Sequence, residues 1–374
     1  MKIRGQGGSR PPGTERGLNV SEGRQNKLTY NEVRYRQALP YEIKIRMSET
    51  RLREFIGYYG EDGVAVSFSG GLDSTFALAF IRERYPRVKA VSVLAIECKQ
   101  NIDLIRKTEN VQPIPPRYSQ KQVIEKFGFP VVSKKVAKAL QALQNPTEKN
   151  AKIRNLALTG ITSEGRKTKT YKLANKWRFL IKAPFKISNK CCYYMKETPI
   201  QNWCKANGYA SIMATTVEES KSRLDGYCKR GGCNSFKGQG DSVPFSFWTR
   251  QDILRYIVEH NIEISQAYGE IKKDENGMYY NTGAQRTGCP VCMFGMEKDE
   301  PGNNRFQKLY YEDNRRWKQV IFDWGYKEVL DYFIENGFKN YQYYPVEILE
   351  KMELEKQKQE EGYQYTIEEI LTNY

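Results

Sequence analysis

The chain has 374 residues, of which 39% are hydrophobic and 13% aromatic, and its formal net charge is +16. This length and composition suffice for one or two hydrophobic cores. No apolar run approaches the ~18 to 20 residues that cross a bilayer, and the basic N-terminus lacks the apolar core of a secretion signal. Eight cysteines in such a chain favour reduced thiols or metal ligands over disulfides, so we expect a cytoplasmic protein without a membrane partner.

The predicted elements begin after a Gly-, Pro- and Arg-rich segment, interpreted as a flexible basic tail at residues 1–30. Apolar residues at roughly helical spacing predict a helix over 41–59, and the β-branched residues of 63–69 predict a buried strand. Residues 74–85 predict the next helix and 87–97 the next strand. This strand–helix–strand order predicts an α/β fold, a parallel twisted sheet with helices on both faces.

The rest of the chain continues this α/β domain and then becomes helical. We predict the domain over residues 31–300, with a basic insertion of weak periodicity at about 140–180. Residues 209–216 predict another inner strand and 249–261 another helix. The aromatic-rich residues 301–374 predict a helical C-terminal region.

Positive charge is concentrated around the insertion. Between residues 133 and 190 there are fifteen Lys and Arg residues against only Glu148 and Glu164, a local excess of +13. Such a segment indicates a polyanionic partner, most obviously nucleic acid. A solvated lysine-rich insertion without any partner is the alternative.

A glycine loop, SGGLDST at residues 69–75, joins the first predicted strand to a helix that we expect to begin near Ser74. Its two glycines permit close approach of a ligand, and the helix directs free N–H groups and its positive end at the loop. Phosphate is the natural occupant of such a loop, with Asp73 holding Mg²⁺ or capping the helix. Walker-A and nucleophile-elbow patterns are absent, and a plain capped turn is the alternative. The candidate nucleotide-binding residues here are Ser67, Ser69, Gly70, Gly71, Asp73, Ser74 and Thr75.

This loop resembles the S-G-G-x-D-S-[ST] motif of the PP-loop ATP pyrophosphatase superfamily. In that superfamily the loop binds the phosphates of ATP, and the enzymes form an adenylated intermediate and release pyrophosphate. The resemblance implies a HUP-like fold, with an adenine nucleotide, ATP, and Mg²⁺ as ligands.

Four cysteines form a candidate metal site. Cys191 and Cys192 are adjacent, whereas Cys289 and Cys292 form a C-x-x-C sequence that can hold one metal centre. Adjacent cysteines are awkward for tetrahedral zinc, but an iron–sulfur cluster can take thiolates from neighbouring positions. We therefore expect a [4Fe–4S] cluster, with zinc and metal-free thiols as alternatives. The C-x4-C sequence at 228–233 is a competing ligand pair.

Four later segments strengthen the resemblance to a family. Residues 191–200 (CCYYMKETPI), 214–223 (ATTVEESKSR), 243–257 (VPFSFWTRQDILRYI) and 286–292 (RTGCPVC) resemble, in family order, segments of the cluster-containing adenylylsulfate reductases. Together with the glycine loop they extend over roughly residues 44–307. The chain thus resembles the phosphoadenosine phosphosulfate reductase family.

The resemblance implies roles for individual residues. The cluster ligands would be Cys191, Cys192, Cys289 and Cys292. Lys196 would lie near both the cluster and the anionic groups of the substrate, and Arg286 would offer a bidentate fork to phosphate or sulfate. With Asp73, these two residues are the catalytic candidates. Trp248 and Asp252 are expected to organise the fold.

A nucleotide site is implied by the Glu-Ser-x-x-Arg sequence, through Glu219, Ser220 and Arg223. The ordinary alternatives are an i,i+4 helix pair for Glu219 with Arg223 and a solvated helix residue for Lys196.

The chain departs from the reductases in two respects. No cysteine follows Cys292, so the C-terminal thiolate with which such reductases attack sulfur has no counterpart. The glycine loop is also the full form expected of an enzyme that handles ATP. We therefore expect an ATP pyrophosphatase on a reductase-like scaffold, which adenylates a substrate, with nucleic acid as one candidate, for sulfur transfer. This combination resembles the cysteine subunit of DNA phosphorothioation systems and cluster-dependent tRNA thiolases, with a sulfur donor or a cysteine desulfurase as a further partner.

Two other functions stay open at this point. A true sulfonucleotide reductase using Cys228 or Cys233, or the thiol of a partner, would release sulfite from adenylylsulfate or its 3′-phosphorylated form. A non-catalytic subunit would bind nucleotide and nucleic acid without turnover.

Overall fold

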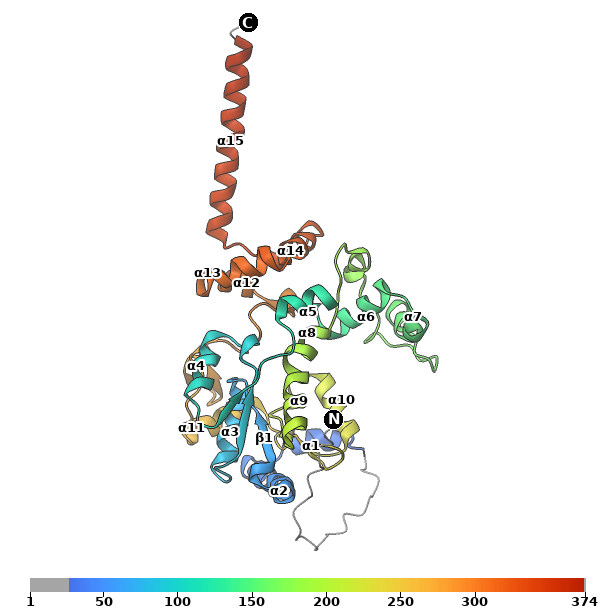
Figure 1. Ribbon diagram of the computed structural model, residues 1–374, viewed down its shortest axis with the longest axis vertical. Coiled ribbons are helices and arrows are strands. Elements are labelled where there is room, and N and C mark those ends of the chain that lie inside the picture. Colours follow the sequence, from blue (N-terminus) through green and yellow to red (C-terminus); the bar gives the residue numbers. More distant parts are fainter. Residues whose placement is uncertain (1–26, 373–374) are drawn as a thin grey trace, which may run out of the picture.

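The computed structural model describes residues 27–372, and its main sheet has six strands, with β1 in the lower body of the molecule (Figure 1). The strand order is β3-β2-β1-β5-β7-β6, and every neighbouring pair is parallel except β6 with β7. The predicted α/β class with a parallel sheet is therefore confirmed. The strands are β1 (Val64–Ser67), β2 (Lys89–Ser92), β3 (Val111–Pro113), β5 (Ala210–Ile212), β6 (Asn234–Ser235) and β7 (Asp241–Ser242).

Helices cover both faces of this sheet. Val64 and Val66 of β1 belong to one large buried cluster, whereas Ala65 belongs to a smaller cluster that contains Cys204. Successive strand side chains point to opposite faces, so the two clusters lie on opposite sides of β1. Helices α2 (Tyr41–Tyr59), α3 (Leu72–Arg82) and α11 (Arg250–Glu259) contribute to the larger cluster, and α9 (Thr198–Asn207) to the smaller one.

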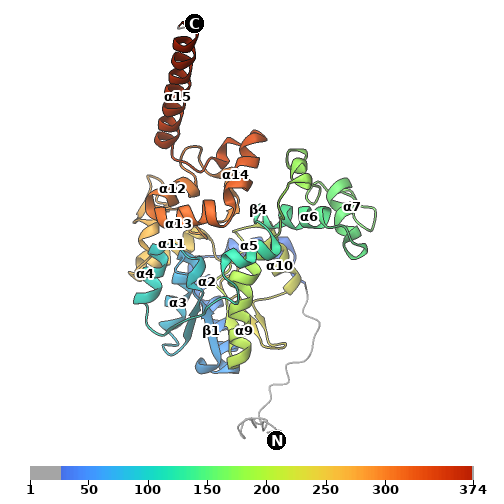
Figure 2. The ribbon, with the colours of Figure 1, turned by 45° about the horizontal axis from the view of Figure 1, so that its top comes forward.

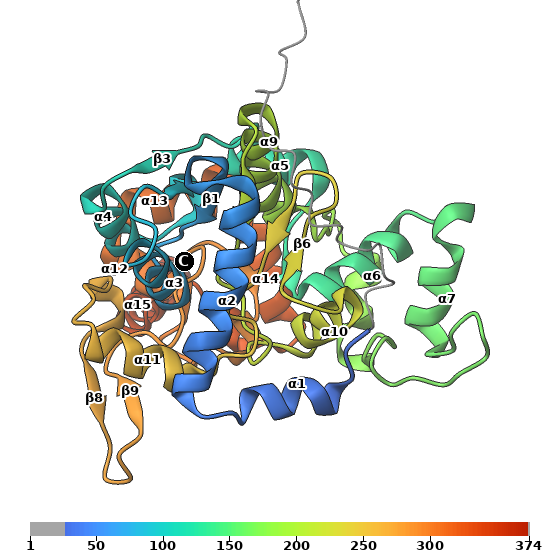
Figure 3. The ribbon, with the colours of Figure 1, turned by 90° about the horizontal axis from the view of Figure 1, so that it is seen from below.

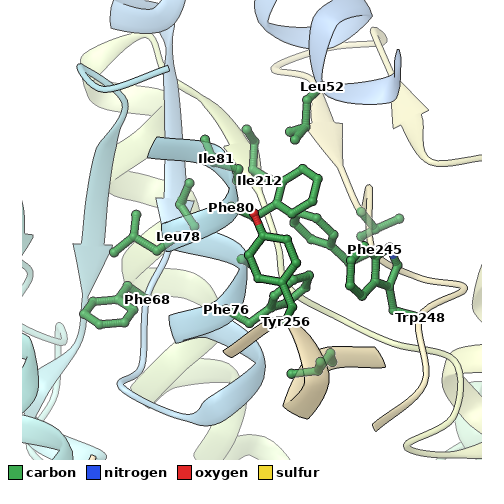
Figure 4. Packing of buried hydrophobic residues seen from close by; sticks show 14 of the residues in the cluster. Leu52, Phe68, Phe76, Leu78, Phe80, Ile81, Ile212, Phe245, Trp248 and Tyr256 are labelled. Carbon is green, nitrogen blue, oxygen red and sulfur yellow. The ribbon is translucent and has the colours of Figure 1, made fainter. Parts of the chain in front are cut away.

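Aromatic side chains fill the larger cluster (Figure 4). The ring of Phe76 lies 4.6 Å from that of Trp248 and 4.9 Å from that of Phe245. The indole N–H of Trp248 donates to the Ser48 hydroxyl at 2.8 Å, so its polar atom is satisfied inside the core. Asp252 pairs with the buried Lys44 at 2.7 Å, and both predicted fold-organising residues thus pack between elements.

A second buried cluster joins the basic insertion to the C-terminal helices. Strand β4 (Val131–Val132) pairs in parallel with β10 (Met293–Phe294), and Trp177 of the insertion stacks on Phe338 at 4.7 Å. The insertion and the region after residue 301 therefore share one core. The helices here are α5 (Gln120–Phe127), α6 (Lys134–Gln144), α7 (Ala151–Thr159), the 3₁₀ segment Asn175–Lys182, α12 (Arg305–Glu312), α13 (Asn314–Lys318) and α14 (Tyr326–Glu335).

The remaining elements lie around these two cores. They are α1 (Tyr30–Gln37), α4 (Lys99–Lys107), α8 (Lys190–Cys192), α10 (Lys221–Arg230), the hairpin β8 (Ile271–Lys273) with β9 (Tyr279–Asn281), and α15 (Val346–Thr372). Helix α15 extends away from the body (Figures 1 and 2). Within residues 27–372, no helix combines the length and apolarity needed to span a membrane.

Several predicted boundaries differ from the structure; for example, the strand predicted over 209–216 is limited to Ala210–Ile212. The helix expected to begin near Ser74 begins at Leu72, because Gly71 already serves as its N-cap. The strand expected over 87–97 ends at Ser92, and a 3₁₀ turn follows at Leu94–Ile96. Most of the tail predicted at 1–30 lies outside the described residues, and α1 already begins at Tyr30.

Candidate functional site

The glycine loop, residues 69–75, which is called the phosphate loop below after its predicted ligand, connects β1 to α3 at the carboxyl end of the sheet. Strands β2 and β5 lie on either side of β1, so the strand order reverses at this point, where ligands bind in open α/β sheets. Gly70 has φ +68°, and a Cβ there would lie 2.9 Å from the carbonyl oxygen of Asn101. Both its backbone conformation and its close approach to Asn101 therefore require glycine.

Part of the predicted hydroxyl set already shapes the loop. The Ser74 hydroxyl donates to the Gly71 carbonyl at 2.9 Å, and it lies 3.2 Å from both the backbone N and the hydroxyl of Ser69. The hydroxyl of Thr75 is buried without a hydrogen-bond partner, which has a free-energy cost that a ligand or water oxygen would remove. Ser74 thus organises the loop, whereas Thr75 retains its donor capacity.

Three residues outside the glycine motif support the loop. The amide Nδ2 of Asn101 donates to the Ser69 carbonyl at 3.1 Å and to the Thr287 hydroxyl at 3.0 Å. The Tyr268 hydroxyl lies 2.7 Å from the Thr287 hydroxyl. A Cβ added to Gly71 would lie 3.3 Å from the Tyr268 hydroxyl. The segment that precedes Cys289 therefore packs against the phosphate loop. None of these three residues was predicted, and the only sequence signal was the position of Thr287 within the RTGCPVC segment.

Two carboxyl groups face each other at the start of α3. Glu219 shares a hydrogen bond with Asp73, and its pKa is raised by burial and by the Asp73 charge, against the lowering effect of Arg223 and Arg286. Mg²⁺ bound at phosphate sites commonly takes one or two carboxylates together with the phosphate oxygens. Asp73 and Glu219 therefore have the chemistry of a Mg²⁺ ligand pair.

Three arginines surround these carboxyl groups. Arg223 Nη2 lies 2.8 Å from Glu219 Oε2, and Arg250 Nη1 lies 3.5 Å from Asp73 Oδ1. The charge of Arg286 also acts on Glu219. Arg250 was not predicted as a site residue, although it begins α11 inside a segment that carries the family resemblance.

Helix α10 begins at this site. The Ser220 hydroxyl accepts from the Arg223 backbone N–H at 3.3 Å and so caps the helix. The pairing of Glu219 with Arg223, which was the ordinary alternative to a nucleotide site, is present, but Glu219 precedes the N-cap Ser220 and also lies beside Asp73. A cavity of about 330 Å³ lies beside Arg223. Its lining is Thr215, Thr216, Val217, Arg223, Gly226, Tyr227, Arg230, Val243 and Ser246.

Lys196 lies between the sheet and the cysteines. It belongs to a π-helical turn, Tyr193–Glu197, a feature that is frequent at functional sites. Its Nζ is 3.5 Å from Glu97 Oε1, and its charge also acts on Cys192. Burial raises the pKa of Glu97, with Lys196 as the main opposing influence. Glu97 was not predicted, because the sequence pattern placed it at the end of a strand.

The four predicted ligand cysteines gather in one place. Burial raises the pKa of Cys191, with further contributions from Cys289, Cys192 and Cys292, and it raises the pKa of Cys292 to about 12. The side-chain amide of Gln120 donates to Cys289 Sγ at 3.4 Å. In the part of the chain that the structure describes, no group of three or more His, Cys, Asp or Glu side chains is arranged to hold a metal ion.

Two polar side chains, Tyr326 and Arg305, lie beside the four cysteines. The hydroxyl of Tyr326 is buried without a hydrogen-bond partner, and the charges of Cys191, Cys289 and Cys292 act on it. Arg305 donates to the Cys292 carbonyl at 2.7 Å and to the Phe294 carbonyl at 3.0 Å, which fixes the C-x-x-C turn.

The competing C-x4-C pair lies elsewhere. Cys228 and Cys233 belong to the large cluster under the sheet, where Cys233 Sγ is 3.3 Å from the Tyr227 hydroxyl. Cys191 belongs to a separate cluster, against which Cys289 packs. The C-x4-C pair is therefore part of the sheet core.

No protein-family model and no curated protein sequence matches the chain. Among solved structures, the phosphoadenylyl-sulfate (PAPS) reductase from Candida auris, in a phosphate complex, is similar to it with a TM-score of 0.33 and 13% sequence identity. The match covers 67% of this chain and 98% of that reductase. This degree of likeness does not extend the activity of the reductase to the present chain.

Proposed function

We propose that the chain binds ATP with Mg²⁺ at the phosphate loop and adenylates a substrate, with release of pyrophosphate, in preparation for sulfur transfer. The observation that carries this proposal is the pair of carboxyl groups, Asp73 and Glu219, among three arginines at a glycine loop. The N–H groups at the start of α3 and the guanidinium groups would bind phosphate oxygens. The two carboxylates would hold Mg²⁺.

The adenylation step requires neutralisation of a leaving pyrophosphate. A substrate oxygen would form a bond to the α-phosphorus, while the bond from that phosphorus to the oxygen bridging to the β-phosphate breaks. Negative charge develops on that bridging oxygen, and guanidinium groups fixed nearby stabilise it. Arg250 and Arg286 are the candidates, since Arg223 is held by Glu219 at 2.8 Å, whereas Arg250 lies at the longer distance of 3.5 Å from Asp73. Lys196, half exposed beside Glu97, would bind the anionic part of the substrate.

The same proposal assigns a [4Fe–4S] cluster to Cys191, Cys192, Cys289 and Cys292. This assignment is supported by the mutual influence of the four thiols and by N–H donors directed at two of their sulfurs, from Gln120 to Cys289 and from the Phe294 backbone to Cys292. The thiols would have to move closer together to bind the cluster, because in the described residues they are not arranged to hold a metal ion. The partnerless Tyr326 hydroxyl offers a further donor there. When bound, the cluster would supply electrons or a site for sulfur in the step after adenylation.

A reductase is less well supported by the residues. Attack on a sulfonucleotide needs an accessible thiolate, and Cys228 and Cys233 were the candidates for it. Cys228 and Cys233 are buried, at 7% and 3% exposure, and burial raises the pKa of both thiols. These properties disfavour either thiol as the nucleophile.

The test uses the full chain purified without oxygen. We expect calorimetry to show Mg²⁺-dependent ATP binding that Asp73→Ala abolishes, whereas the matched Asp62→Ala, at an exposed aspartate away from the loop, retains it. We also expect pyrophosphate release with a nucleic-acid substrate from a panel. Absence of ATP binding, unchanged nucleotide with every substrate, or sulfite release from adenylylsulfate without ATP would each overturn the proposal.

A further inference from the structure

The basic insertion forms an arm on the side of the molecule, built from α6, α7 and the segment Asn175–Lys182 (Figures 1 and 2). Of the fifteen Lys and Arg side chains between residues 133 and 190, thirteen are exposed. Among the described residues, one ion pair joins this set to a carboxylate, that of Lys134 with Glu197 at 3.0 Å. Exposed cations without acidic neighbours maintain a positive field at the surface. The arm therefore attracts polyanions.

These cations continue from the arm to the candidate nucleotide site. The charge of Arg223 acts on Lys134, and that of Lys221 acts on Lys135. Lys221 and Arg223 lie in the first turn of α10, and Figure 3 shows α6 beside α10. Arg223 in turn pairs with Glu219, which lies beside Asp73 of the phosphate loop, so a chain of cations with interspersed carboxylates (Glu197, Glu219) links the arm to that loop.

Two exposed tyrosines border this positive surface. Tyr171 is 49% exposed, and Lys135 Nζ lies 5.0 Å from the centre of its ring. Tyr30 is 46% exposed, and its hydroxyl donates to Asp225, one turn after Lys221 on α10. The hydrogen bond to Asp225 is the main cause that raises the pKa of Tyr30, and Tyr171 contributes a further increase, so the two tyrosines lie within electrostatic range of each other.

Aromatic rings beside cations are the combination that binds unpaired nucleic-acid strands. Bases of a single strand stack on exposed aromatic faces while Lys and Arg contact the phosphates. A duplex keeps its bases stacked inside and presents no free base face to Tyr171 or Tyr30.

We propose that Lys135, Tyr171, Lys221 and Tyr30 form a track that binds a single strand of nucleic acid and leads it to the phosphate loop. The inference names the substrate class for the proposed function, and it rests on that function for what happens to the bound strand. Binding itself requires no ATP. DNA and RNA single strands share the chemistry of stacked bases and phosphates, and the experiment distinguishes them.

The test measures fluorescence anisotropy of short labelled single strands of DNA and of RNA, and of the matching duplex, with the full chain over a range of salt concentrations. We expect one or both single strands to bind more tightly than the duplex. Tyr171→Ala should weaken binding about tenfold, whereas Tyr171→Phe retains the ring and the affinity. Removing Lys135 and Lys221 together should reduce the slope of log affinity against log salt by roughly 0.7 for each lost phosphate contact.

The matched control is the double substitution Lys205→Ala with Lys237→Ala, which removes the same charge at exposed positions away from the track. It should leave affinity and salt slope unchanged. Equal losses in the control, unchanged binding by Tyr171→Ala, or a duplex that binds at least as tightly as the single strands would overturn the inference. If the chain binds the strand but releases no pyrophosphate, only the proposed function is contradicted. If it releases pyrophosphate while adenylating a small acceptor but binds no strand, only this inference is contradicted.

Discussion

Replacement of Gly70 by alanine tests whether the phosphate loop depends on its unusual backbone. Gly70 has φ +68°, and a new Cβ would lie 2.9 Å from the Asn101 carbonyl oxygen and 3.1 Å from the Asn101 Cβ. The left-handed conformation costs alanine about 1–2 kcal/mol, and crowding in a packed site costs about 1–3 kcal/mol more. The free energy of unfolding should therefore fall by about 2–5 kcal/mol, and ATP binding should be lost because the loop must move.

Two other glycines separate these contributions. Gly165 has φ +77°, and a Cβ added there would have no atom within 4 Å, so Gly165→Ala should show the conformational cost alone, about 1–2 kcal/mol. Gly71 has φ −74°, and the nearest contact of a Cβ there would be the Tyr268 hydroxyl at 3.3 Å. Gly71→Ala should therefore change stability little while weakening ATP binding.

Urea unfolding followed by tryptophan fluorescence gives the three free energies, and calorimetry gives the ATP affinities. If Gly70→Ala is no less stable than Gly165→Ala, the close approach of Asn101 to the loop has no energetic consequence. If Gly70→Ala also binds ATP as the unaltered chain does, the loop is not the nucleotide site.

Three further predictions concern buried polar groups. Burial raises the pKa of Glu97, so the folded state disfavours its carboxylate form. The free energy of unfolding of the unaltered chain, relative to that of Glu97→Gln, should therefore increase as the pH falls through the raised pKa and level off below the unfolded value of about 4.3. Urea unfolding at a series of pH values measures this difference. Lys44→Met removes one partner of the 2.7 Å pair with Asp252, in which the two side chains are 3% and 12% exposed. The free energy of unfolding should fall by about 3–5 kcal/mol, and adding Asp252→Asn should recover part of this loss. Full stability of the single variant would show that the pair is dispensable. Tyr326→Phe removes a buried hydroxyl without a partner and should stabilise the metal-free protein by about 1–3 kcal/mol in thermal or urea unfolding, whereas a loss of stability would reveal a partner for that hydroxyl.

The phosphate loop was predictable because its chemistry lies in contiguous residues. Glycines, a carboxylate and hydroxyls follow one another between a β-branched strand and an apolar helix, and each has a local physical role. The helix start was misplaced by two residues, since Gly71 caps α3 without a side-chain hydrogen bond and leaves no Ser, Thr or Asp signal at that position.

The supporting residues were not predictable in the same way. Asn101 contacts Thr287 across 186 positions of sequence, and Arg250 reaches Asp73 from a different helix. Such contacts depend on how α4, α11 and the segment before Cys289 pack together. Short strands were missed for a related reason, because β6 and β7 have two residues each and show no period-two alternation.

The charge balance at the loop is the reason that we propose a metal-bound triphosphate as its ligand, in preference to a lone sulfate or phosphate ester. Asp73 and Glu219 oppose the binding of an anion, and they partly cancel Arg223, Arg250 and Arg286. A site for a simple anion gains nothing from a second carboxyl group, Glu219, whose pKa is raised by burial and by the Asp73 charge. With Mg²⁺ between them the same groups become ligands, and the arginines are released to bind the several charges of a triphosphate. The carboxyl pair thus makes sense at this loop when the ligand arrives with its own cation.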